Sequence, residues 1–538
     1  MRFFLLSLLS LSVVKFLYDF AGLDAYDFVV VGGGPGGSMV ADRLSEDLTV
    51  NVLLLEVGGE NDPATTIPQE ELMAEIIWAL VWVIRVPSTA WYTTRGSADD
   101  IDKWAELSGD QGWSWDSMLP YFKKGEKFNI IPRNGHNTTG QYLPAFHGTD
   151  GVIGSLARSL RGTDNRLAGQ QMILQPWALS WMSANRVINR EMEGRRSSAK
   201  AHLLRAENEG RENIDVLLHA RVSRVVPTVD GMLDLRSVEV LDPADASNIF
   251  LSRVTQNLTA KNEIILSTGS VMTPTILHSG IGDPELLEPL SITTISSLPS
   301  VGKNLTDHIG IAEWTENKTG LLTDTSENHA AWLRLPDNST MFDNYSDPSS
   351  GPLTAHYEFL FQAWHVLQNG LSSVRASGSY INVPTACVSP ASRGSVSINS
   401  SDPFSKPLVD PALLTAPVDI LIVLEPIKAA RRFFSGPAWE GYILGSLNNN
   451  ATTDEEIEEF IRENVVPFFH PVSTASMSPV GADWGVVDPD LKVKGASGLK
   501  VVDASVIPRL PAAHTSAPVY AVAERAADII KAAIWVAG

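Results

Sequence analysis

The segment YDFVVVGGGPGGSMVADRLSEDLTVNVLLLEVGG, residues 26–59, constrains the fold more than any other part of the chain. Its residues 28–31 form an apolar, β-branched run, which predicts a buried strand of a parallel sheet. Three glycines follow with the spacing G-x-G-x-x-G: Gly32, Gly34 and Gly37. We expect a helix from Ser38 to Ser45 and a second strand over 52–55. This order of elements predicts a Rossmann-like dinucleotide-binding domain.

The glycines and the acid after the second strand explain how such a site would bind its cofactor. Glycines allow a tight turn and let a pyrophosphate approach the N-terminus of the helix closely. Glu56 ends the second strand, and an acid at this position accepts hydrogen bonds from the ribose hydroxyls. Glu56 favours an unphosphorylated ribose, so the sequence predicts FAD or NAD rather than NADP.

Length and charge limit the number of domains and the kinds of partner. The chain has 538 residues, which is too long for one simple core and predicts two or more domains. Its formal net charge of −21 repels phosphate backbones and anionic lipid surfaces, so we expect no nucleic-acid partner. Cys387 is the only cysteine, which excludes an intramolecular disulfide and a cysteine-based metal site. No metal site is predicted.

The N-terminus has the pattern of a secretory leader. Arg2 is followed by an apolar run over residues 3–14, which has the length of a signal-peptide core and is too short to span a bilayer unaided. The sequence therefore predicts a signal peptide over about residues 1–22 and no stable membrane insertion. An N-terminal anchor is the alternative.

Glycosylation motifs also indicate export. Asn-x-Ser/Thr triplets without an intervening proline begin at Asn137, Asn257, Asn304, Asn317, Asn338, Asn344, Asn399 and Asn450. Together with the leader, they predict a secreted, extracellular glycoprotein.

Two histidines in the C-terminal part are candidate catalytic residues. His470 lies in FFHPVSTASMSP, just after an amphipathic helix predicted over 452–464. His514 lies between a strand predicted over 499–502 and a helix expected over 516–534, whose N-terminus favours negative charge. Each has a structural alternative: a packed core residue for His470, and a capping or loop residue for His514.

Further motifs extend the pattern over most of the chain. They are RGSADDIDKWAELSGDQGWSWDSMLPYFKKGE from Arg95, GRRSSAKAHLL from Gly194, GSVMTPTILHSGIG from Gly269 and VGKNLTDH from Val301. With the glycine motif and the C-terminal histidines, the chain resembles the glucose–methanol–choline (GMC) family of flavoprotein oxidoreductases from Tyr26 almost to its end. Its C-terminal part is similar to the fungal secreted aryl-alcohol oxidases.

The resemblance implies an α/β fold with two domains. A Rossmann-like FAD-binding domain would be assembled from residues 24–60, 195–310 and 484–538. A second, α+β substrate domain, built on an antiparallel sheet, would take 61–194 and 311–483 with connecting segments. FAD would be bound non-covalently, because no histidine or cysteine lies between Gly59 and Arg95, and we expect a monomer.

The resemblance also implies roles for individual residues. His470 would be the catalytic base facing the flavin, and His514 would flank the substrate hydroxyl. Cofactor contacts would come from Gly32, Gly34, Gly37, Glu56, the backbone of Val222, Asp503 and Thr515. Phe469 would form an aromatic wall of the substrate pocket, with Phe361 and Trp364 as further candidates for which ordinary core packing is the alternative. His308 would order the loop near the pyrophosphate.

This set of residues suits the oxidation of an alcohol. A neutral imidazole can take the hydroxyl proton while the carbon gives a hydride to flavin N5. The sequence therefore predicts a secreted FAD-dependent alcohol oxidase that acts on a primary, aryl or benzylic alcohol and reduces O2 to H2O2. A sugar or other alcohol dehydrogenase of the same family, with a different electron acceptor, is the alternative.

The chain departs from the family pattern at three places. No Gly-Gly-Ser-Ser flavin loop occurs between Gly59 and Arg95, a second segment is short after His308, and Ser473 replaces a motif glycine. A missing flavin loop would remove backbone donors to the pyrophosphate. An inactive chain that lacks flavin is therefore a third hypothesis.

Overall fold

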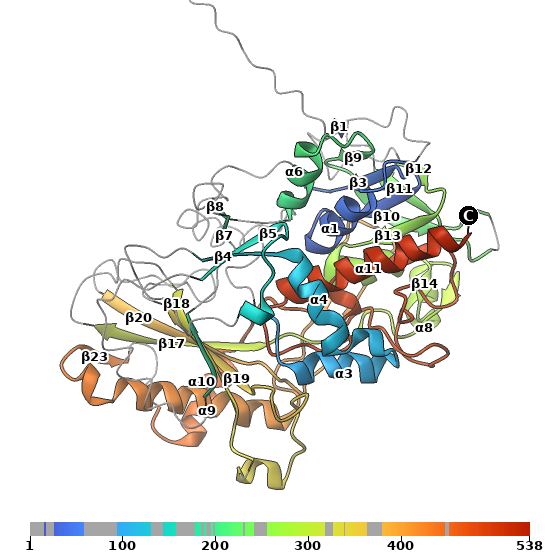
Figure 1. The fold of residues 1–538 in the computed structure, drawn as a ribbon. Helices are drawn as coiled ribbons and strands as arrows, with labels where there is room; N and C mark the ends of the chain where they lie inside the picture. The colour runs from blue at the N-terminus through green and yellow to red at the C-terminus, as the bar shows by residue number, and fades with distance from the viewer. Residues whose placement is uncertain are drawn as a thin grey trace, which may run out of the picture.

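Two separate β-sheets organise the computed structural model, one parallel and one antiparallel (Figure 1). The structure describes residues 15–17, 26–58, 94–130, 144–157, 178–183, 188–189, 195–196, 199–229, 232–241, 255–317, 327–337, 339–362, 379–446 and 451–537. Within these residues, no helix is both long and apolar enough to cross a membrane.

The first sheet is the predicted Rossmann-like sheet, and all of its neighbouring strands run parallel. Its strands, in spatial order, are β1 (Lys15–Leu17), β9 (Ile214–Leu217), β3 (Val52–Leu55), β2 (Phe28–Val31), β13 (Glu263–Leu266) and β25 (Leu499–Val501). Every residue of β2 and β3 is buried. A strand covered on both faces needs such a continuous apolar run, which is why the sequence located both strands correctly.

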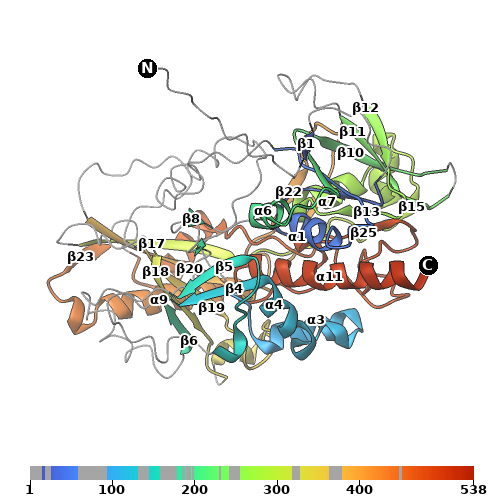
Figure 2. The same ribbon diagram turned by 45° about the horizontal axis from the view of Figure 1, so that its top comes forward.

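Helices from distant parts of the chain cover this sheet. The C-terminal helix α11 (Ser516–Ala537) packs against α1 (Pro35–Leu44) and α4 (Trp115–Gly125), and α6 (Lys200–Asn208) packs against α1 (Figures 1 and 2). Other elements contribute residues to the core around the parallel sheet. They are α3 (Ala98–Ser108), α7 (Gly269–Leu277) and an antiparallel meander of β10 (Arg221–Val226), β11 (Ser237–Leu241) and β12 (Thr255–Thr259). The first and last parts of the described chain therefore share one hydrophobic core.

The second sheet is antiparallel, as expected for the substrate domain. Its strands, in spatial order, are β23 (Ile443–Ser446), β17 (Ile309–Asn317), β20 (Ser379–Cys387), β19 (Tyr357–Gln362), β18 (Glu327–Leu333) and β6 (Ala178–Ser183), and β24 (Val466–Pro467) also pairs with β17. The long helix α9 (Pro417–Phe434) packs on it, with Ile422 and Phe433 meeting Phe359 of the sheet in a second core. Among the described residues, each sheet thus contributes to its own large hydrophobic core.

Local signals predicted several elements well. The amphipathic helix appears as α10 (Asp454–Asn464), and Thr453 and Glu456 form a capping box at its start. One element lies where the sequence predicted a leader: residues 15–17 pair with β9 as the outermost strand. The other residues of the predicted leader lie outside the described part of the chain, and the leader stays a prediction.

Candidate active site

His470 is brought to the junction of the two sheets by the pairing of β24 with β17. Gly310 pairs with Val466 and Ile309 with Pro467, and Thr306 forms a separate bridge with Val472. Between these two points of pairing, residues 468–471 form a loop opposite residues 307–308. Phe469, in this loop, has a φ of 63°, in the left-handed region. The loop therefore sets His470 directly against the segment that carries His308.

Both the ring and the backbone of His470 are held by that segment. Nδ1 of His470 lies 2.9 Å from Nδ1 of His308, and Nε2 of His308 lies 3.1 Å from the carbonyl oxygen of Pro511. The backbone N–H of His470 donates to Oδ1 of Asp307 at 2.9 Å. The family resemblance implied that His308 orders the loop near the pyrophosphate, which stays a prediction; the structure places its ring in contact with His470.

His514 completes a pair of imidazoles. It lies just before α11, and its ring centroid is 4.6 Å from that of His470. Its Nε2 lies 3.1 Å from Oε1 of Glu358, a fully buried residue of β19. Its backbone N–H donates to Oγ1 of Thr94 at 2.7 Å. The antiparallel sheet, through Glu358 and the β24–β17 pairing, and the segment before α11 therefore fix the histidine pair.

Burial controls the charge of these groups. Burial lowers the pKa of His470 well below 6.5, and positive charge on His514 or His308 would lower it further. Burial likewise lowers the pKa of His308 to about 4. Asp307 shows the opposite effect: burial raises its pKa to about 7, against backbone N–H groups of the loop that favour its ionised form. At neutral pH, His470 is therefore an uncharged imidazole, the form that a general base requires.

Aromatic side chains close the site on one side. The ring of Phe468 meets those of His470 and His514 at centroid distances of 5.7 and 6.3 Å, and Trp332 of β18 lies 6.4 Å from His514. Phe469, the predicted wall residue, has 84% of its surface exposed. The aromatic contact with the histidines thus falls one residue earlier than the sequence analysis placed it. Phe361 lies in β19, and Trp364 lies outside the described residues.

The glycine motif forms the predicted turn between β2 and α1. Gly32 has a φ of 102°, which side chains rarely adopt, and a Cβ on Gly37 would lie 1.9 Å from the carbonyl oxygen of Gly32. By contrast, a Cβ on Gly34 would meet no atom nearer than 4.0 Å. The conformation of the turn therefore requires glycine at positions 32 and 37, whereas there is empty space beside Gly34.

Glu56 lies beside this turn and is buried. Its Oε2 accepts from the N–H of Gly33 at 2.6 Å, and its Oε1 accepts from that of Gly58 at 2.7 Å. Burial raises the pKa of this carboxyl, and the two N–H groups oppose that shift. Each carboxylate oxygen keeps a further lone pair for a ribose hydroxyl. The turn and Glu56 together fit the adenosine and pyrophosphate part of FAD.

The other predicted cofactor residues lie at three places around the same sheet. The carboxylate of Asp503 is buried and accepts from the N–H of Gly269 at 2.9 Å and from the hydroxyl of Thr273 at 2.6 Å, so it ties the end of β25 to α7. Burial raises its pKa. Val222 is buried in β10 beside a bulge, and Thr515 directly precedes α11. The region of the missing Gly-Gly-Ser-Ser loop, 59–93, lies outside the described residues.

Ser473 shows why a glycine suits its position in the motif. Its φ is 75°, in the region that favours glycine, and its side chain is buried. Its hydroxyl donates to the carbonyl oxygen of Ile507 at 2.7 Å. The serine therefore adopts the glycine conformation, with one hydrogen bond to offset part of the strain.

The predicted glycosylation sites differ in their accessibility. Asn257, Asn344 and Asn399 are exposed. Asn304 is half-buried, and its amide lies 3.5 Å from Oγ of Ser476. Asn317 lies in β17, whereas Asn137, Asn338 and Asn450 lie outside the described residues. In the described part of the chain, no three histidine, cysteine or acidic residues are grouped to hold a metal ion.

Three features of the site were not predicted from the sequence: Glu358, Phe468 and the contact of His308 with His470. Glu358 had a visible signal, since it is the one acid in the mostly apolar strand YEFLFQ. Side chains alternate between the two faces of a strand, so Glu358 lies on the opposite face from Tyr357 and Phe359, which pack into the second core. A buried acidic side chain needs a polar partner inside the protein, which makes it a candidate site residue.

Comparison with known proteins identifies the family of the chain. Family models described as GMC oxidoreductase match residues 89–310 and 390–523. A pyranose dehydrogenase of Agaricus campestris is 37% identical over 95% of this chain and 94% of its own length, and pyranose dehydrogenase 3 of Leucoagaricus meleagris is 36% identical over 94% and 92%. The alignment with the first spans 579 positions, more than the 538 residues of this chain, so that relative has segments that this chain lacks.

Solved structures share the fold. A fungal aryl-alcohol oxidase superposes with a TM-score of 0.73 at 26% identity, covering 94% of this chain and 99% of its own. A formate oxidase gives a TM-score of 0.80 at 24% identity, covering 95% of this chain and 98% of its own. On the sequence matches, this chain belongs to the GMC oxidoreductase family, whose members are FAD-dependent enzymes that oxidise alcohol or sugar donors.

Proposed function

We propose that this protein oxidises a hydroxyl group of a pyranose-type sugar and passes the electrons through FAD to an acceptor other than O2. The observation that carries the proposal is the buried pair of His470 and His514, with ring centroids 4.6 Å apart. The names and identities of the pyranose dehydrogenases support the sugar as substrate and a dehydrogenase as the type of enzyme.

The residues of the site have separate tasks. His470, uncharged at neutral pH, accepts the proton of the substrate hydroxyl. Glu358 accepts from Nε2 of His514 and so fixes the orientation of the second imidazole beside the reacting hydroxyl. Phe468 and Trp332 exclude water from the two rings. FAD, when bound, accepts the hydride from the carbon that carries the hydroxyl.

An aryl alcohol is the second candidate substrate, with O2 as the acceptor and H2O2 as the product. Two observations favour it: the aromatic rings of Phe468 and Trp332 beside the histidines, and the structural similarity to an aryl-alcohol oxidase. A ring stacked against these side chains would place a benzylic hydroxyl near the imidazoles.

Flavin reduction in the absence of O2 tests the proposal. The purified protein would be mixed with pyranose sugars and with benzylic alcohols, and its visible absorption followed. Bleaching by sugars, with reoxidation by a quinone faster than by air, supports the proposal. Bleaching by benzylic alcohols and rapid reoxidation by air support the second candidate instead. A protein that stays colourless with added FAD contradicts both and supports the third hypothesis, a chain that lacks flavin.

A pair of variants checks the role of His470. His470→Asn should slow flavin reduction by at least about 100-fold, because general-base catalysis is worth about that much or more. His147→Asn is the matched control, since His147 contacts Glu126 and stacks on Phe128 of β4 (Glu126–Ile130). Equal rates for the two variants would exclude His470 as the base.

We also propose that the protein is secreted as a glycosylated monomer. The leader pattern and the exposure of Asn257, Asn344 and Asn399 support this proposal. Recovery from the culture medium, a mass decrease on treatment with an endoglycosidase and a monomeric mass by light scattering are the expected results. Retention in the cell without a mass change would contradict it.

A further inference from the structure

We propose that His308 sets the tautomer of His470, so that the proton of the neutral imidazole stays on Nδ1 and Nε2 carries the lone pair. The inference rests on the proposed function, in which His470 is the base. It makes His308 a positioning residue, because it acts on the substrate only through His470.

The carbonyl group of Pro511 fixes the tautomer of His308. Its oxygen lies 3.1 Å from Nε2 of His308. A carbonyl oxygen can only accept a hydrogen bond, so Nε2 of His308 must carry a hydrogen. A neutral imidazole has one N–H and one bare nitrogen. Nδ1 of His308 is therefore bare and can only accept.

The bare Nδ1 of His308 in turn determines which nitrogen of His470 carries a hydrogen. The two Nδ1 atoms are 2.9 Å apart, which is a hydrogen-bond distance and requires one hydrogen between them. Since Nδ1 of His308 has none to give, the hydrogen belongs to Nδ1 of His470. The other nitrogen of His470, Nε2, then has a free lone pair with which to accept a proton.

His308 determines the tautomer of His470 only while both rings are uncharged. The ionisable groups that face them are Glu358, His514 and Asp307. Negative charge on Glu358 favours a proton on His308, but burial and positive charge on His514 act in the opposite direction. Burial dominates and lowers the pKa of His308 to about 4, so the ring is neutral over the ordinary working range of pH.

The backbone of His470 is fixed by the residue next to His308. Oδ1 of Asp307 accepts from the N–H of His470 at 2.9 Å, while the ring of His308 holds the ring of His470. Two consecutive residues, Asp307 and His308, thus hold both the position of the loop and the tautomer of its histidine. Because both the backbone N–H and the ring of His470 are hydrogen-bonded, the ring has little freedom to turn.

Nitrogen NMR tests the tautomer without depending on turnover. The full-length protein would be labelled with 15N-histidine, and the signals of His470 identified by their loss in His470→Asn. We expect a protonated Nδ1 and a bare Nε2 at pH 7. A protonated Nε2 would overturn the proposal. The expected tautomer together with an active His470→Asn variant would instead refute the proposed function and leave the tautomer assignment in place.

Two amide variants of His308 separate its role from simple packing. In His308→Asn, the amide oxygen can occupy the place of Nδ1 and still accept from His470. In His308→Gln, the amide group reaches the place of Nε2, where it can form a hydrogen bond only with the carbonyl oxygen of Pro511. We expect flavin reduction within about threefold of the original rate for His308→Asn and a loss of about tenfold or more for His308→Gln. The Gln variant should also show a protonated Nε2 on His470. Equal rates with an unchanged tautomer would overturn the proposal.

Discussion

His470 is surrounded by groups that oppose its protonation, and this affects the pH dependence of the reaction. Burial lowers its pKa well below 6.5, and positive charge on His514 or His308 would add to the shift. The active form of the base is the neutral one, so a lowered pKa keeps the site active as the pH falls below 6.5. We expect the rate of flavin reduction to stay constant from pH 8 to below 6.5 and to fall only in more acidic solution. Stopped-flow measurements with the best substrate check this. An acidic limb with an apparent pKa at or above 6.5 would contradict it.

Asp307 should make its own contribution to the pH dependence of stability. Its pKa is raised from 3.8 to about 7 in the folded protein. Between these values the unfolded carboxyl ionises while the folded one keeps its proton, so the stability that it contributes is lost as the pH rises. Asp307→Asn cannot ionise and keeps one oxygen to accept from the N–H of His470. The stability of this variant relative to the original protein should therefore increase from pH 4 to 8.

Urea unfolding at several pH values measures this effect, with Asp150→Asn, an exposed site, as the control. The control should differ from the original protein by the same small amount at each pH. A constant difference for Asp307→Asn as well would show that the carboxyl of Asp307 ionises normally.

The turn between β2 and α1 permits a test at the scale of one element. A Cβ on Gly36 would lie 2.3 Å from the carbonyl oxygen of Val502, just after β25, whereas a Cβ on Gly34 has space. Gly36→Ala should destabilise the protein by about 1–3 kcal/mol, because a methyl group is forced into a packed region. Gly34→Ala should change the stability of the flavin-free protein by no more than about 0.5 kcal/mol.

Gly34→Ala should nevertheless weaken FAD binding, because the new methyl group occupies the space through which the pyrophosphate approaches the helix. Thermal unfolding without FAD and fluorescence titration with FAD separate the two effects. If Gly34→Ala binds FAD as tightly as the original protein, the cofactor does not approach the turn at this glycine.

The elements that the sequence predicted correctly are those with local signals. Strands β2 and β3 follow from apolar runs, and α10 follows from its periodicity and the capping box at Thr453. The neighbours of His470 have no such signal. His308 reaches His470 through a pairing between residues more than 150 positions apart, and Glu358 depends on the order of strands in the antiparallel sheet. Sequence patterns report local periodicity, and they do not give the register between distant strands.

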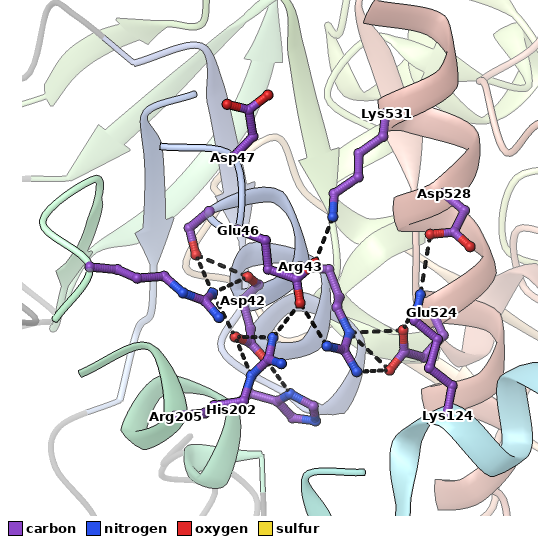
Figure 3. Close-up of polar contacts among 12 residues, drawn as sticks. Asp42, Arg43, Glu46, Asp47, Lys124, His202, Arg205, Glu524, Asp528 and Lys531 are labelled. Carbon is purple, nitrogen blue, oxygen red and sulfur yellow. Dashed lines mark hydrogen bonds and ion pairs between the residues drawn. The ribbon is translucent and has the colours of Figure 1, made fainter. Parts of the chain in front are cut away.

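At the scale of the whole molecule, a network of ion pairs joins segments from the two ends of the described chain (Figure 3). Arg43 of α1 makes hydrogen bonds of 2.6–3.0 Å with Glu524 of α11. On the other side of α1, Asp42 binds His202 at 2.7 Å and Arg205 at 2.8 Å, both from α6. The network therefore connects three helices that cover the parallel sheet.

Exposure divides the members of this network into two kinds. The side chain of Glu524 is fully buried, and that of Arg43 is nearly so. One turn further along α11, Asp528 has 45% of its side chain exposed and pairs with Lys124 at 3.2 Å. Without Glu524, the buried Arg43 is still paired with the partly exposed Glu46 at 2.7 Å. Loss of one partner of a buried pair typically costs about 3–5 kcal/mol. An exposed pair contributes about 0–1 kcal/mol.

Glu524→Ala and Asp528→Ala compare the two kinds on the same helix. Both remove an acid that pairs across helices, and both place alanine, a good helix former, in α11. We expect Glu524→Ala to lower the stability by about 3–5 kcal/mol and Asp528→Ala by no more than about 1 kcal/mol. Urea unfolding followed by circular dichroism measures both, and high salt should reduce only the smaller effect, since buried pairs are screened much less. Similar losses in the two variants would mean that solvent reaches Arg43 once Glu524 is removed, so that the burial of this pair adds nothing to the attachment of α11 to α1.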